Sequence, residues 1–363
     1  MGINSTYSFP EFKGKRVFVT GHTGFKGFWL SVWLQKLGAH VKGYSLEPQY
    51  IPNLYSLKGG GHLSESEIGD IRNFNSLSKS ICDFQPDIIF HLAAQPLVRY
   101  SYENPLETYE TNVMGTAHVL ESLKLVDGEC VVVVITTDKV YHNNEWYFPY
   151  REVDRLGGYD PYSSSKACAE LVVDSYRNAF FHPLRIKDHQ KRIFSARAGN
   201  VIGGGDWSMD RLVPDIVRQL QEGSEIAIRN PTATRPWQHV MEPLSGYLSI
   251  AQAAMQKPET FVDGAWNFGP DPSDNLKVIE IVKMAISSWG AGTYSIQQDI
   301  KAPHEAGILN LDISKALNTL CWHPKMDAAK AVQLTIDWYK QFYEGMDPME
   351  LIHQNIDTYT SMN

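Results

Sequence analysis

The chain has 363 residues and carries 33 lysines and arginines against 41 aspartates and glutamates, a formal net charge of -8. This balance disfavours a nucleic-acid partner, since no basic stripe is available to match a phosphate backbone. A membrane-spanning helix is also disfavoured, because the longest apolar run, residues 131–135, is far shorter than the roughly 20 residues that such a helix needs.

The composition favours a cytoplasmic enzyme without a metal. Residues 1–9 are polar and lack the charged-then-apolar pattern of a secretion signal. The histidines show no metal-ligand spacing. The four cysteines, Cys82, Cys130, Cys168 and Cys321, form no C-x-x-C pair, so we expect reduced and mostly buried thiols. The chain is long enough to bury a large core and to split into two unequal lobes.

A glycine-rich loop follows the first predicted strand. Residues 17–20 are a short apolar strand, Gly21, Gly24 and Gly27 recur at every third position, and 28–37 is an apolar helix. The first glycine allows a tight turn, the second a close approach to phosphate, and the third tight packing of helix on strand. Free N–H groups at the start of that helix can hold an anion. With a strand before and a helix after, the loop predicts a nucleotide site rather than an ordinary turn.

Further apolar runs predict a layered fold for the first half of the chain. Residues 40–44, 87–92 and 131–136 are predicted strands, and 105–125 and 163–180 carry apolar residues at helical spacing. Strands that are almost continuously apolar are covered on both faces, as in a parallel sheet between helix layers. The predicted fold class is therefore α/β, a Rossmann-type doubly wound parallel sheet.

The pattern changes after about Arg197, where prolines interrupt the sequence repeatedly. Short helices are predicted at 214–221, 279–289 and 328–343, whereas the chain after Asp347 gives no prediction. We expect a smaller mixed α/β C-terminal lobe whose loops lie over the mouth of the sheet, where open α/β folds bind ligands. The predicted domains are 1–197 for the nucleotide, with 240–266 returning to it, and 198–239 with 267–363 for the substrate.

Tyr162 and Lys166 lie four residues apart at the start of a predicted helix, which puts both side chains on one helix face. A nearby ammonium group favours the phenolate, so we expect Lys166 to bring the pKa of Tyr162 toward that of a general base. The alternative is two surface residues that happen to be four apart. The nucleotide loop upstream favours the catalytic interpretation.

Thr137, Asp138 and Lys139 leave the carboxyl end of the buried strand 131–136. Residues in that position point into the ligand crevice of an open α/β sheet. Asp138 and Lys139 would there place an acid beside a potential base, as a proton-transfer reaction requires. The alternative is a strand-end turn in which Asp138 is only a cap, but the Tyr162–Lys166 pair points to the same site.

Four motifs together resemble the extended short-chain dehydrogenase/reductase family: the glycine loop, residues 91–95 (His-Leu-Ala-Ala-Gln), Thr137-Asp138-Lys139 and Tyr162-x-x-x-Lys166. Within that family the chain resembles the nucleotide-sugar 4,6-dehydratases over nearly its whole length. Residues 21–27, 197–207 and 235–240 resemble the members that act on CDP-sugars. Lys139 agrees with this branch, because most sister dehydratases carry glutamate there.

The resemblance implies a tightly held NAD that is reduced and reoxidised within one turnover. Tyr162 would take the proton of the C4 hydroxyl, Lys166 would hold the nicotinamide ribose, and Thr137 would hydrogen-bond the 4-oxygen. Asp138 would protonate the departing C6 hydroxyl. Lys139 would take the C5 proton, which requires a neutral amine, so we expect a buried Lys139 that titrates together with Asp138.

The resemblance also implies the binding residues. Arg235 is expected to clamp the substrate pyrophosphate with two hydrogen bonds, the alternative being a salt-bridged loop arginine before a proline. His239 is expected to be a packed loop histidine. The residues expected at NAD are Gly21, Thr23, Gly24, Phe25, Lys26, Gly27, Asp70, Ile71, Leu92, Ala93, Ala94, Tyr162 and Lys166. The residues expected at the substrate are Gln95, Arg99, Asn200, Arg211, Leu212 and Arg235.

Two departures from the family pattern qualify these expectations. No carboxylate for the adenosine ribose ends the second predicted strand, which is followed by Ser45 and Leu46, and Glu47 is expected past the strand tip. We therefore expect NAD to be held more loosely than is usual. The second departure is Gly307, where similar enzymes carry histidine, so the choice of nucleotide base can differ.

The implied reaction converts CDP-D-glucose into CDP-4-dehydro-6-deoxy-D-glucose, a precursor of deoxysugars such as those of O-antigen-type lipopolysaccharide. A homodimer is expected through helices 105–125 and 163–180, although core packing explains the same apolar faces. The alternatives are another nucleotide sugar, a 4-epimerase, a ketoreductase, or a non-catalytic NAD-binding protein. Asp138 with Lys139 favours dehydration over epimerisation, and the presence of Tyr162 and Lys166 argues against a silent protein.

Overall fold

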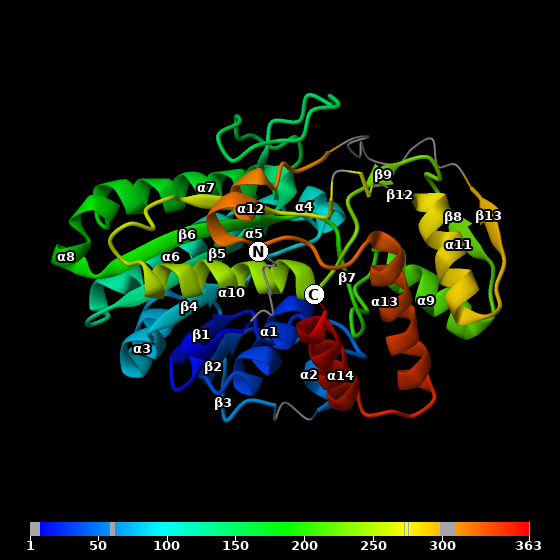
Figure 1. The fold of residues 1–363 in the computed structure, drawn as a ribbon, viewed down its shortest axis with the longest axis horizontal. Coiled ribbons are helices and arrows are strands. Elements are labelled where there is room, and N and C mark those ends of the chain that lie inside the picture. The colour runs from blue at the N-terminus through cyan, green and yellow to red at the C-terminus, as the bar shows by residue number, and fades with distance from the viewer. Residues whose placement is uncertain (1–7, 59–61, 272, 275, 298–308, 363) are drawn as a thin grey trace, which may run out of the picture.

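Seven parallel strands form the central sheet, in the order β11-β6-β5-β4-β1-β2-β3 (Figure 1). The computed structural model describes residues 8–58, 62–271, 273–274, 276–297 and 309–362, so Gly307 lies outside the described residues. The strands are β1 (Arg16–Thr20), β2 (His40–Ser45), β3 (Glu65–Ile68), β4 (Ile88–His91), β5 (Cys130–Ile135), β6 (Lys191–Ala198) and β11 (Ala265–Phe268). The strand order reverses between β1 and β4, where doubly wound folds bind their ligands.

The four strands predicted from apolar runs are confirmed as β1, β2, β4 and β5, and all six residues of β5 are buried. Sequence patterns missed β6, although all eight of its residues are buried. Its sequence contains Lys191, Arg192 and Arg197. These charged residues interrupt the apolar run that would predict a buried strand. Each of these charges has a partner: Lys191 donates to the Gly128 carbonyl, and the two arginines form ion pairs with Glu129 and Glu170.

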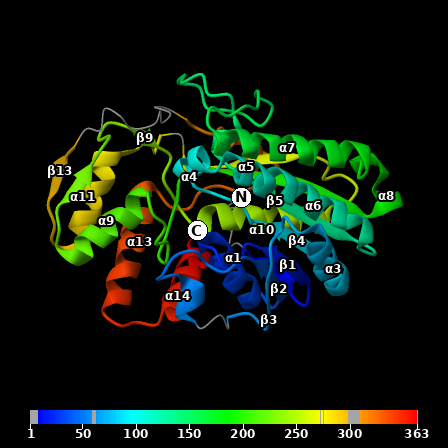
Figure 2. The ribbon, with the colours of Figure 1, turned by 180° about the vertical axis from the view of Figure 1, so that it is seen from behind.

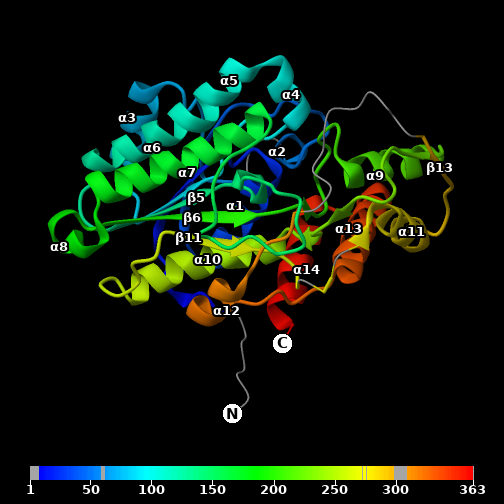
Figure 3. The same ribbon diagram turned by 90° about the horizontal axis from the view of Figure 1, so that it is seen from above.

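Helices cover both faces of the sheet. One face carries α3 (Phe74–Phe84), α6 (Gly115–Ser122) and α7 (Pro161–Ala179), seen from behind in Figure 2. The other face carries α1 (Phe25–Lys36) and α10 (Met241–Gln256), and Figure 3 shows the sheet between the two layers. The strand side chains alternate between these layers, so that Val132 and Val134 face one layer while Val131 and Val133 face the other.

The helix predicted at 105–125 is continuous but irregular. It consists of α5 (Pro105–Tyr109), a π-helical turn (Glu110–Met114), α6 and a final 3-10 turn (Leu123–Leu125). The helices predicted in the second half are confirmed as α9 (Leu212–Glu222), α11 (Val278–Trp289) and α13 (Ala328–Tyr343). The remaining short helices are α2 (Leu54–Leu57), α4 (Val98–Glu103), α8 (Ile186–His189) and α12 (Ser314–Leu320).

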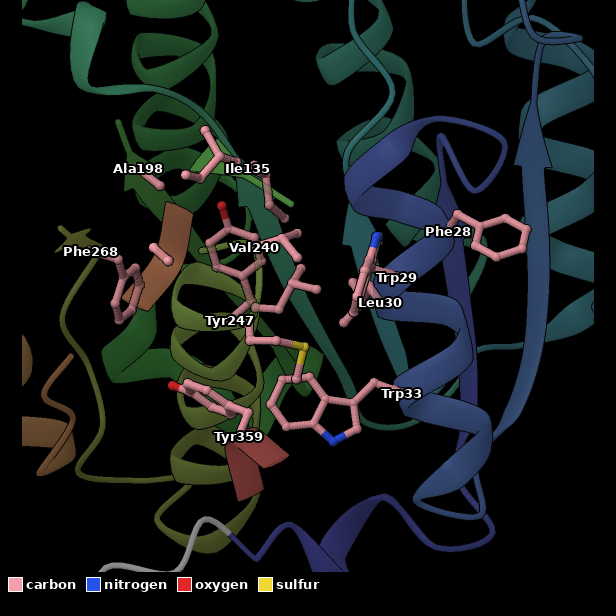
Figure 4. Packing of buried hydrophobic residues seen from close by; sticks show 14 of the residues in the cluster. Phe28, Trp29, Leu30, Trp33, Ile135, Ala198, Val240, Tyr247, Phe268 and Tyr359 are labelled. Carbon is pink, nitrogen blue, oxygen red and sulfur yellow. The ribbon is translucent and has the colours of Figure 1, made fainter. Parts of the chain in front are cut away.

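The chain after Asp347 forms α14 (Pro348–Ser361), which sequence patterns did not reveal. Asp347 caps this helix by accepting from the Met349 amide at 2.7 Å. The helix packs on α1, where the Tyr359 ring meets the Trp33 ring edge-on, as the close view of the core shows (Figure 4). Trp29 of α1 lies in the same apolar cluster, so the last helix completes the core next to the glycine loop.

Three small strand pairs build the second lobe beside the sheet. They are β7 (Val201–Ile202) with β10 (Gln238–His239), β9 (Thr234–Arg235) with β12 (Leu276–Lys277), and β8 (Ile226–Ile228) with β13 (Tyr294–Ile296). The loop between β7 and α9 packs tightly, because a Cβ on Gly204 would lie 2.0 Å from the Trp338 ring. No helix among the described ranges has both the length and the apolar character needed to cross a membrane.

Candidate active site

The glycine loop joins β1 to α1 at very short backbone distances. A Cβ on Gly27 would lie 2.0 Å from the Gly21 carbonyl oxygen, and one on Gly21 would lie 2.7 Å from the Ala93 amide nitrogen. Gly24 precedes α1 and offers no side chain to cap it. Thr23 fixes the loop to the end of β2 by a hydrogen bond to the Leu46 carbonyl at 2.9 Å. A helix N-terminus that is free of side chains fits the pyrophosphate of a dinucleotide.

The adenosine side of that site has no free carboxylate at the end of β2. The strand ends at Ser45, and Glu47 lies beyond it with an exposed side chain. Asp70 follows β3, but Arg72 donates to its carboxylate at 2.8 and 2.7 Å. Although burial raises the pKa of Asp70, these hydrogen bonds hold it below its ordinary value. Ile71 is buried, and its side chain fills the space next to Gly115.

The predicted reacting groups meet at the carboxyl end of β5. Thr137 donates to Asp138 Oδ1 at 2.8 Å, and Asp138 is 3% exposed. Tyr162 lies in the first turn of α7, and Thr137 is close enough to lower its pKa. One turn later, Lys166 Nζ donates to the Ile135 carbonyl at 3.1 Å. Helix α7 begins at this point because Asp160 caps it by accepting from the Ser163 amide at 2.9 Å.

The structure corrects the expected acidity of Tyr162. Burial raises its pKa to about 12, and neither Thr137 nor the charge of Arg211 offsets this effect. The ammonium group of Lys166 is directed to the Ile135 carbonyl. Burial lowers the pKa of Lys166 itself to about 8, against the opposing charge of Glu170. With a pKa raised to about 12, Tyr162 is a neutral phenol at neutral pH.

The expected burial of Lys139 is also wrong. Its side chain is 37% exposed, while the adjacent Asp138 side chain is 4% exposed. Lys139 Nζ lies 3.9 Å from Asp138 Oδ1, within ion-pair distance. The difference has a geometric cause: a 3-10 turn, Asp138–Val140, directs Asp138 and Val140 inward and leaves Lys139 at the cavity surface. The acid and the base of the predicted pair therefore have different access to solvent.

A cavity of about 1560 Å³ opens in front of these groups. Its wall contains Thr137, Asp138, Lys139 and Tyr162 on the side of the sheet. The second lobe closes the opposite side. Five of the six residues expected at the substrate line this cavity: Arg99, Asn200, Arg211, Leu212 and Arg235. A volume of this size suits a ligand as large as a nucleotide sugar.

Gln95 is the expected substrate residue that the structure does not place in the cavity wall. Its amide nitrogen donates to Thr108 Oγ1 at 2.9 Å, and its amide oxygen accepts from the Leu97 amide at 2.6 Å. These contacts shape the turn that leads into α4. His239 is fully buried and meets the Trp29 ring edge-on, so it is a packed histidine as predicted.

Several arginines of the cavity form ion pairs with carboxylates. Arg211 donates to Asp206 at 2.9 Å, and Arg99 Nη1 lies 3.0 Å from Asp210 Oδ1. Arg235 donates to the Thr234 carbonyl at 3.0 Å. Arginine is suited to a pyrophosphate because its planar group can donate two parallel hydrogen bonds. The cavity therefore combines groups that recognise phosphate with carboxylates that balance them.

Sequence patterns missed Glu170 and gave Lys26 only its expected place at NAD. The side chain of Lys26 lines the cavity. Burial and the charges of Lys166 and Arg211 together lower its pKa to about 7, against the opposing charges of Asp138 and Asp206. Glu170 lies one helical turn beyond Lys166 and is buried. The repeated four-residue spacing of Tyr162, Lys166 and Glu170 was the available signal.

No group of three or more histidine, cysteine, aspartate or glutamate side chains within the described ranges is arranged to hold a metal ion. All four cysteines are free, and Cys130 is buried whereas Cys321 is exposed. Burial raises the pKa of the Cys130 thiol to about 12, so this thiol stays protonated at neutral pH.

Comparisons with known proteins agree with this geometry. The sequence profile of the GDP-mannose 4,6 dehydratase family matches residues 18–335. The chain is 50% identical over 349 residues to the CDP-glucose 4,6-dehydratase of Salmonella typhimurium, which covers 96% of this chain and 97% of that protein. It is 26% identical to the CDP-paratose 2-epimerase of Salmonella typhi, over 89% of this chain and 98% of that protein.

Solved structures show the same fold at lower identity. The dTDP-glucose 4,6-dehydratase from Bacillus anthracis, in complex with NAD, superposes with a TM-score of 0.73 at 22% identity. The match covers 93% of this chain and 100% of that one. At this level of identity, the likeness establishes the doubly wound architecture and its second lobe.

Proposed function

The chain belongs to the GDP-mannose 4,6 dehydratase family, and from this premise we propose that it is an NAD-dependent lyase that dehydrates CDP-glucose. The product is CDP-4-dehydro-6-deoxyglucose, with one water released. The 50% identity to a CDP-glucose 4,6-dehydratase supports this choice among nucleotide sugars. The placement of Asp138, Lys139 and Tyr162 on one cavity wall is the structural observation that carries the proposal.

Bound NAD supplies the acceptor, and later the donor, of the hydride that moves from C4 to C6. The glycine loop and the N-terminus of α1 would hold its pyrophosphate, because Gly24 leaves that end of the helix free of side chains. Residues 92–94, at the end of β4, would lie along the cofactor. Lys166 would turn from the Ile135 carbonyl to the nicotinamide ribose.

The protein's own groups would divide the proton transfers. Tyr162 accepts the proton of the C4 hydroxyl, and Thr137 hydrogen-bonds the same oxygen, which is consistent with the closeness of the two side chains. The resulting 4-ketone makes the C5 hydrogen acidic. Lys139 then removes the C5 proton while Asp138 donates a proton to the departing C6 hydroxyl. When the hydride adds to C6, Lys139 returns its proton to C5, which completes the product. The buried position of Asp138 suits a proton donor, and Lys139 lies beside it at the cavity surface.

The positions of these residues support an assignment of segments of the chain to NAD and to the substrate. We assign residues 1–197 and 240–266 to NAD, and 198–239 with 267–363 to the substrate. Arg99, Asn200, Arg211, Leu212 and Arg235 line the cavity and are the proposed contacts of the nucleotide sugar. Gln95 would act through the turn that it stabilises.

We further propose that the enzyme is a cytoplasmic homodimer in lipopolysaccharide deoxysugar synthesis. Its substrate and cofactor classes are cytoplasmic metabolites, which supports the location. Exposed apolar side chains on α5 and α7 support the dimer: Leu106 is 78% exposed and Leu171 is 58% exposed. A 4-dehydro-6-deoxy sugar nucleotide is a suitable precursor for deoxysugars of surface glycans.

A substrate panel tests the proposed activity. The purified protein is incubated with CDP-, dTDP-, UDP- and GDP-glucose and a catalytic amount of NAD, and loss of one water is followed by mass spectrometry. CDP-glucose should show the highest kcat/KM, and no net reduced cofactor should be consumed. A clear preference for another nucleotide would refute the assigned substrate, and stoichiometric use of NADPH would indicate a reductase.

A further inference from the structure

A buried ion pair lies directly behind the reacting groups and has no role in the mechanism above. Arg197 Nε and Nη2 donate to the two carboxylate oxygens of Glu170, both at 2.9 Å. Each side chain is 4% exposed. The desolvation of such a pair is offset only by good geometry and additional hydrogen bonds. Here the bidentate arrangement provides the geometry.

The additional hydrogen bonds of this pair come from the segments that carry the site. Thr136 donates to Glu170 Oε1 at 2.5 Å and Ser195 donates to Oε2 at 2.7 Å, so the carboxylate ties β5 and β6 to α7. Arg197 Nη1 donates to the Tyr141 hydroxyl at 2.8 Å. Tyr141 directly follows the turn that carries Asp138 and Lys139.

The pair therefore joins every element that presents a reacting group. Thr136 precedes Thr137 and Asp138, and Glu170 lies one helical turn beyond Lys166 on α7. Lys166 bonds the Ile135 carbonyl while Glu170 bonds the next residue of the strand. The helix that carries Tyr162 is thus fixed to the end of β5 at two consecutive residues.

We propose that the Glu170–Arg197 pair is a positioning device, which holds Tyr162 and Lys166 in register with Thr137 and Asp138 and supplies the negative charge that keeps Lys166 protonated. This inference rests on the proposed function for the identity of the reaction. The fixed register and the charge on Lys166 can be measured without the sugar nucleotide. Glu170 and Arg197 touch no reacting atom, and they act through the residues that they hold.

The charge balance around Lys166 supports the second part of the proposal. The charged and titratable groups that act on Lys166 are Glu170 on its own helix, Lys26 of α1 and His91 of β4. Arg197 of β6 pairs with Glu170. Burial lowers the pKa of Lys166, and Glu170 is the group that raises it. Burial lowers the pKa of His91 to about 3, so this ring is neutral at neutral pH and supplies no compensating charge.

The effect of the Glu170 charge on Lys166 is tested by measuring the affinity for NAD as a function of pH. Titrations of the cofactor-free protein by calorimetry from pH 6 to pH 10 give the pH at which NAD affinity falls as Lys166 loses its proton. In E170Q this midpoint should move to lower pH by about one unit or more, the effect expected for losing a neighbouring opposite charge. E170Q/R197M removes both buried charges, so it folds without an unpaired cation, and its midpoint should move in the same direction.

The register of Tyr162 and Lys166 against Thr137 and Asp138 is tested by variants that keep the charge of Glu170. T136V removes one hydrogen bond to Glu170, so kcat should fall about tenfold or more, as expected for a misplaced reacting group, while KM and the NAD midpoint stay at the wild-type values. The matched control is E129Q, which breaks the ion pair between Glu129 and Arg192 at the other end of β6. This control should leave both readouts unchanged.

Different results would overturn the two parts of the proposal. A wild-type NAD midpoint in folded E170Q or E170Q/R197M would overturn the role of the charge. Wild-type kcat in T136V would overturn the role in positioning. An inactive wild-type protein on CDP-glucose would instead refute the proposed function, while the NAD titrations would still decide the inference about Lys166.

Discussion

Tyr162 is the residue whose chemistry depends most on what binds beside it. Burial raises its pKa to about 12, so the phenol is protonated throughout the neutral range. Its conversion into a base requires positive charge or hydrogen-bond donors that arrive with the cofactor or move on binding. Lys166, which bonds the Ile135 carbonyl, is such a donor one helical turn beyond Tyr162.

Tyr162→Phe should abolish formation of NADH in the complex with substrate, because no group is left to take the C4 hydroxyl proton. NADH is followed by its near-ultraviolet absorbance in a single turnover. The matched control is Tyr247→Phe, which removes a buried hydroxyl without a hydrogen-bond partner among the described residues. NADH formation at the wild-type rate in Tyr162→Phe would rule out this residue as the base.

Lys139→Ala should separate oxidation from elimination. Because Lys139 acts only after a 4-ketone exists, the variant should still form enzyme-bound NADH. Elimination of water should slow by roughly 100-fold or more, the scale of losing a general acid or base. The measurement compares the rates of NADH formation and of water loss by rapid quench. Near-normal dehydration would show that Asp138 or an ordered water, and not Lys139, takes the C5 proton.

At the scale of elements, Glu242 fastens α14 to α10. The carboxylate is fully buried, accepts from the Lys325 and Met326 amides at 2.9 and 2.8 Å, and accepts from the Tyr359 hydroxyl at 2.8 Å. Burial nevertheless raises its pKa to about 7, since the three hydrogen bonds only partly replace water. The C-terminal helix is therefore attached through a group that titrates near neutral pH.

The direction of the resulting pH dependence follows from linkage. The folded pKa of about 7 exceeds the ordinary value of about 4.5 for a glutamate, so the stability that Glu242 contributes is fully present below pH 4.5. This contribution is lost as the pH rises through about 7, which lowers the free energy of unfolding by roughly 3 kcal/mol in total. Glu242→Gln keeps the shape and cannot ionise. The free energy of unfolding of this variant should therefore rise relative to wild type between pH 5 and pH 8.

Urea unfolding at a series of pH values measures this difference. The comparison with wild type cancels the buried histidines, whose pKa values are lowered and which titrate in both proteins. Glu344→Gln, a change of an exposed side chain at the end of α13, serves as the control and should show no pH-dependent difference. A constant difference between Glu242→Gln and wild type across this range would contradict the role of Glu242.

At the scale of the whole molecule, the exposed apolar side chains of α5 and α7 predict a dimer. Leu106→Glu together with Leu171→Glu should give a monomer, because a charge would be buried at each position of the proposed interface. Light scattering after size-exclusion chromatography measures the mass. Leu184→Glu is the control, since Leu184 is 80% exposed but lies near α8, away from α5. A wild-type species that is already monomeric would refute the dimer.

The sequence by itself determined the features that depend on local physics. Almost continuous apolar runs identified β4 and β5, because strands covered on both faces favour apolar residues. The shorter segments 17–20 and 40–44 identified β1 and β2. The glycine spacing identified the turn between β1 and α1. The four-residue spacing of Tyr162 and Lys166 was sufficient to place both on one helix face, and the motif at the end of β5 was sufficient to place Thr137 and Asp138 near them.

Only the tertiary structure decided the features that depend on partners distant in the sequence. The hydrophobic signal of β6 is concealed by charges, and a strand containing Arg197 can be buried only because Glu170 lies opposite it. The raised pKa of Tyr162 and the exposure of Lys139 depend on how much water each side chain loses, which no local pattern specifies. Helix α14 carries too few apolar residues to be evident alone, and it forms against α1 because most helical stability comes from packing.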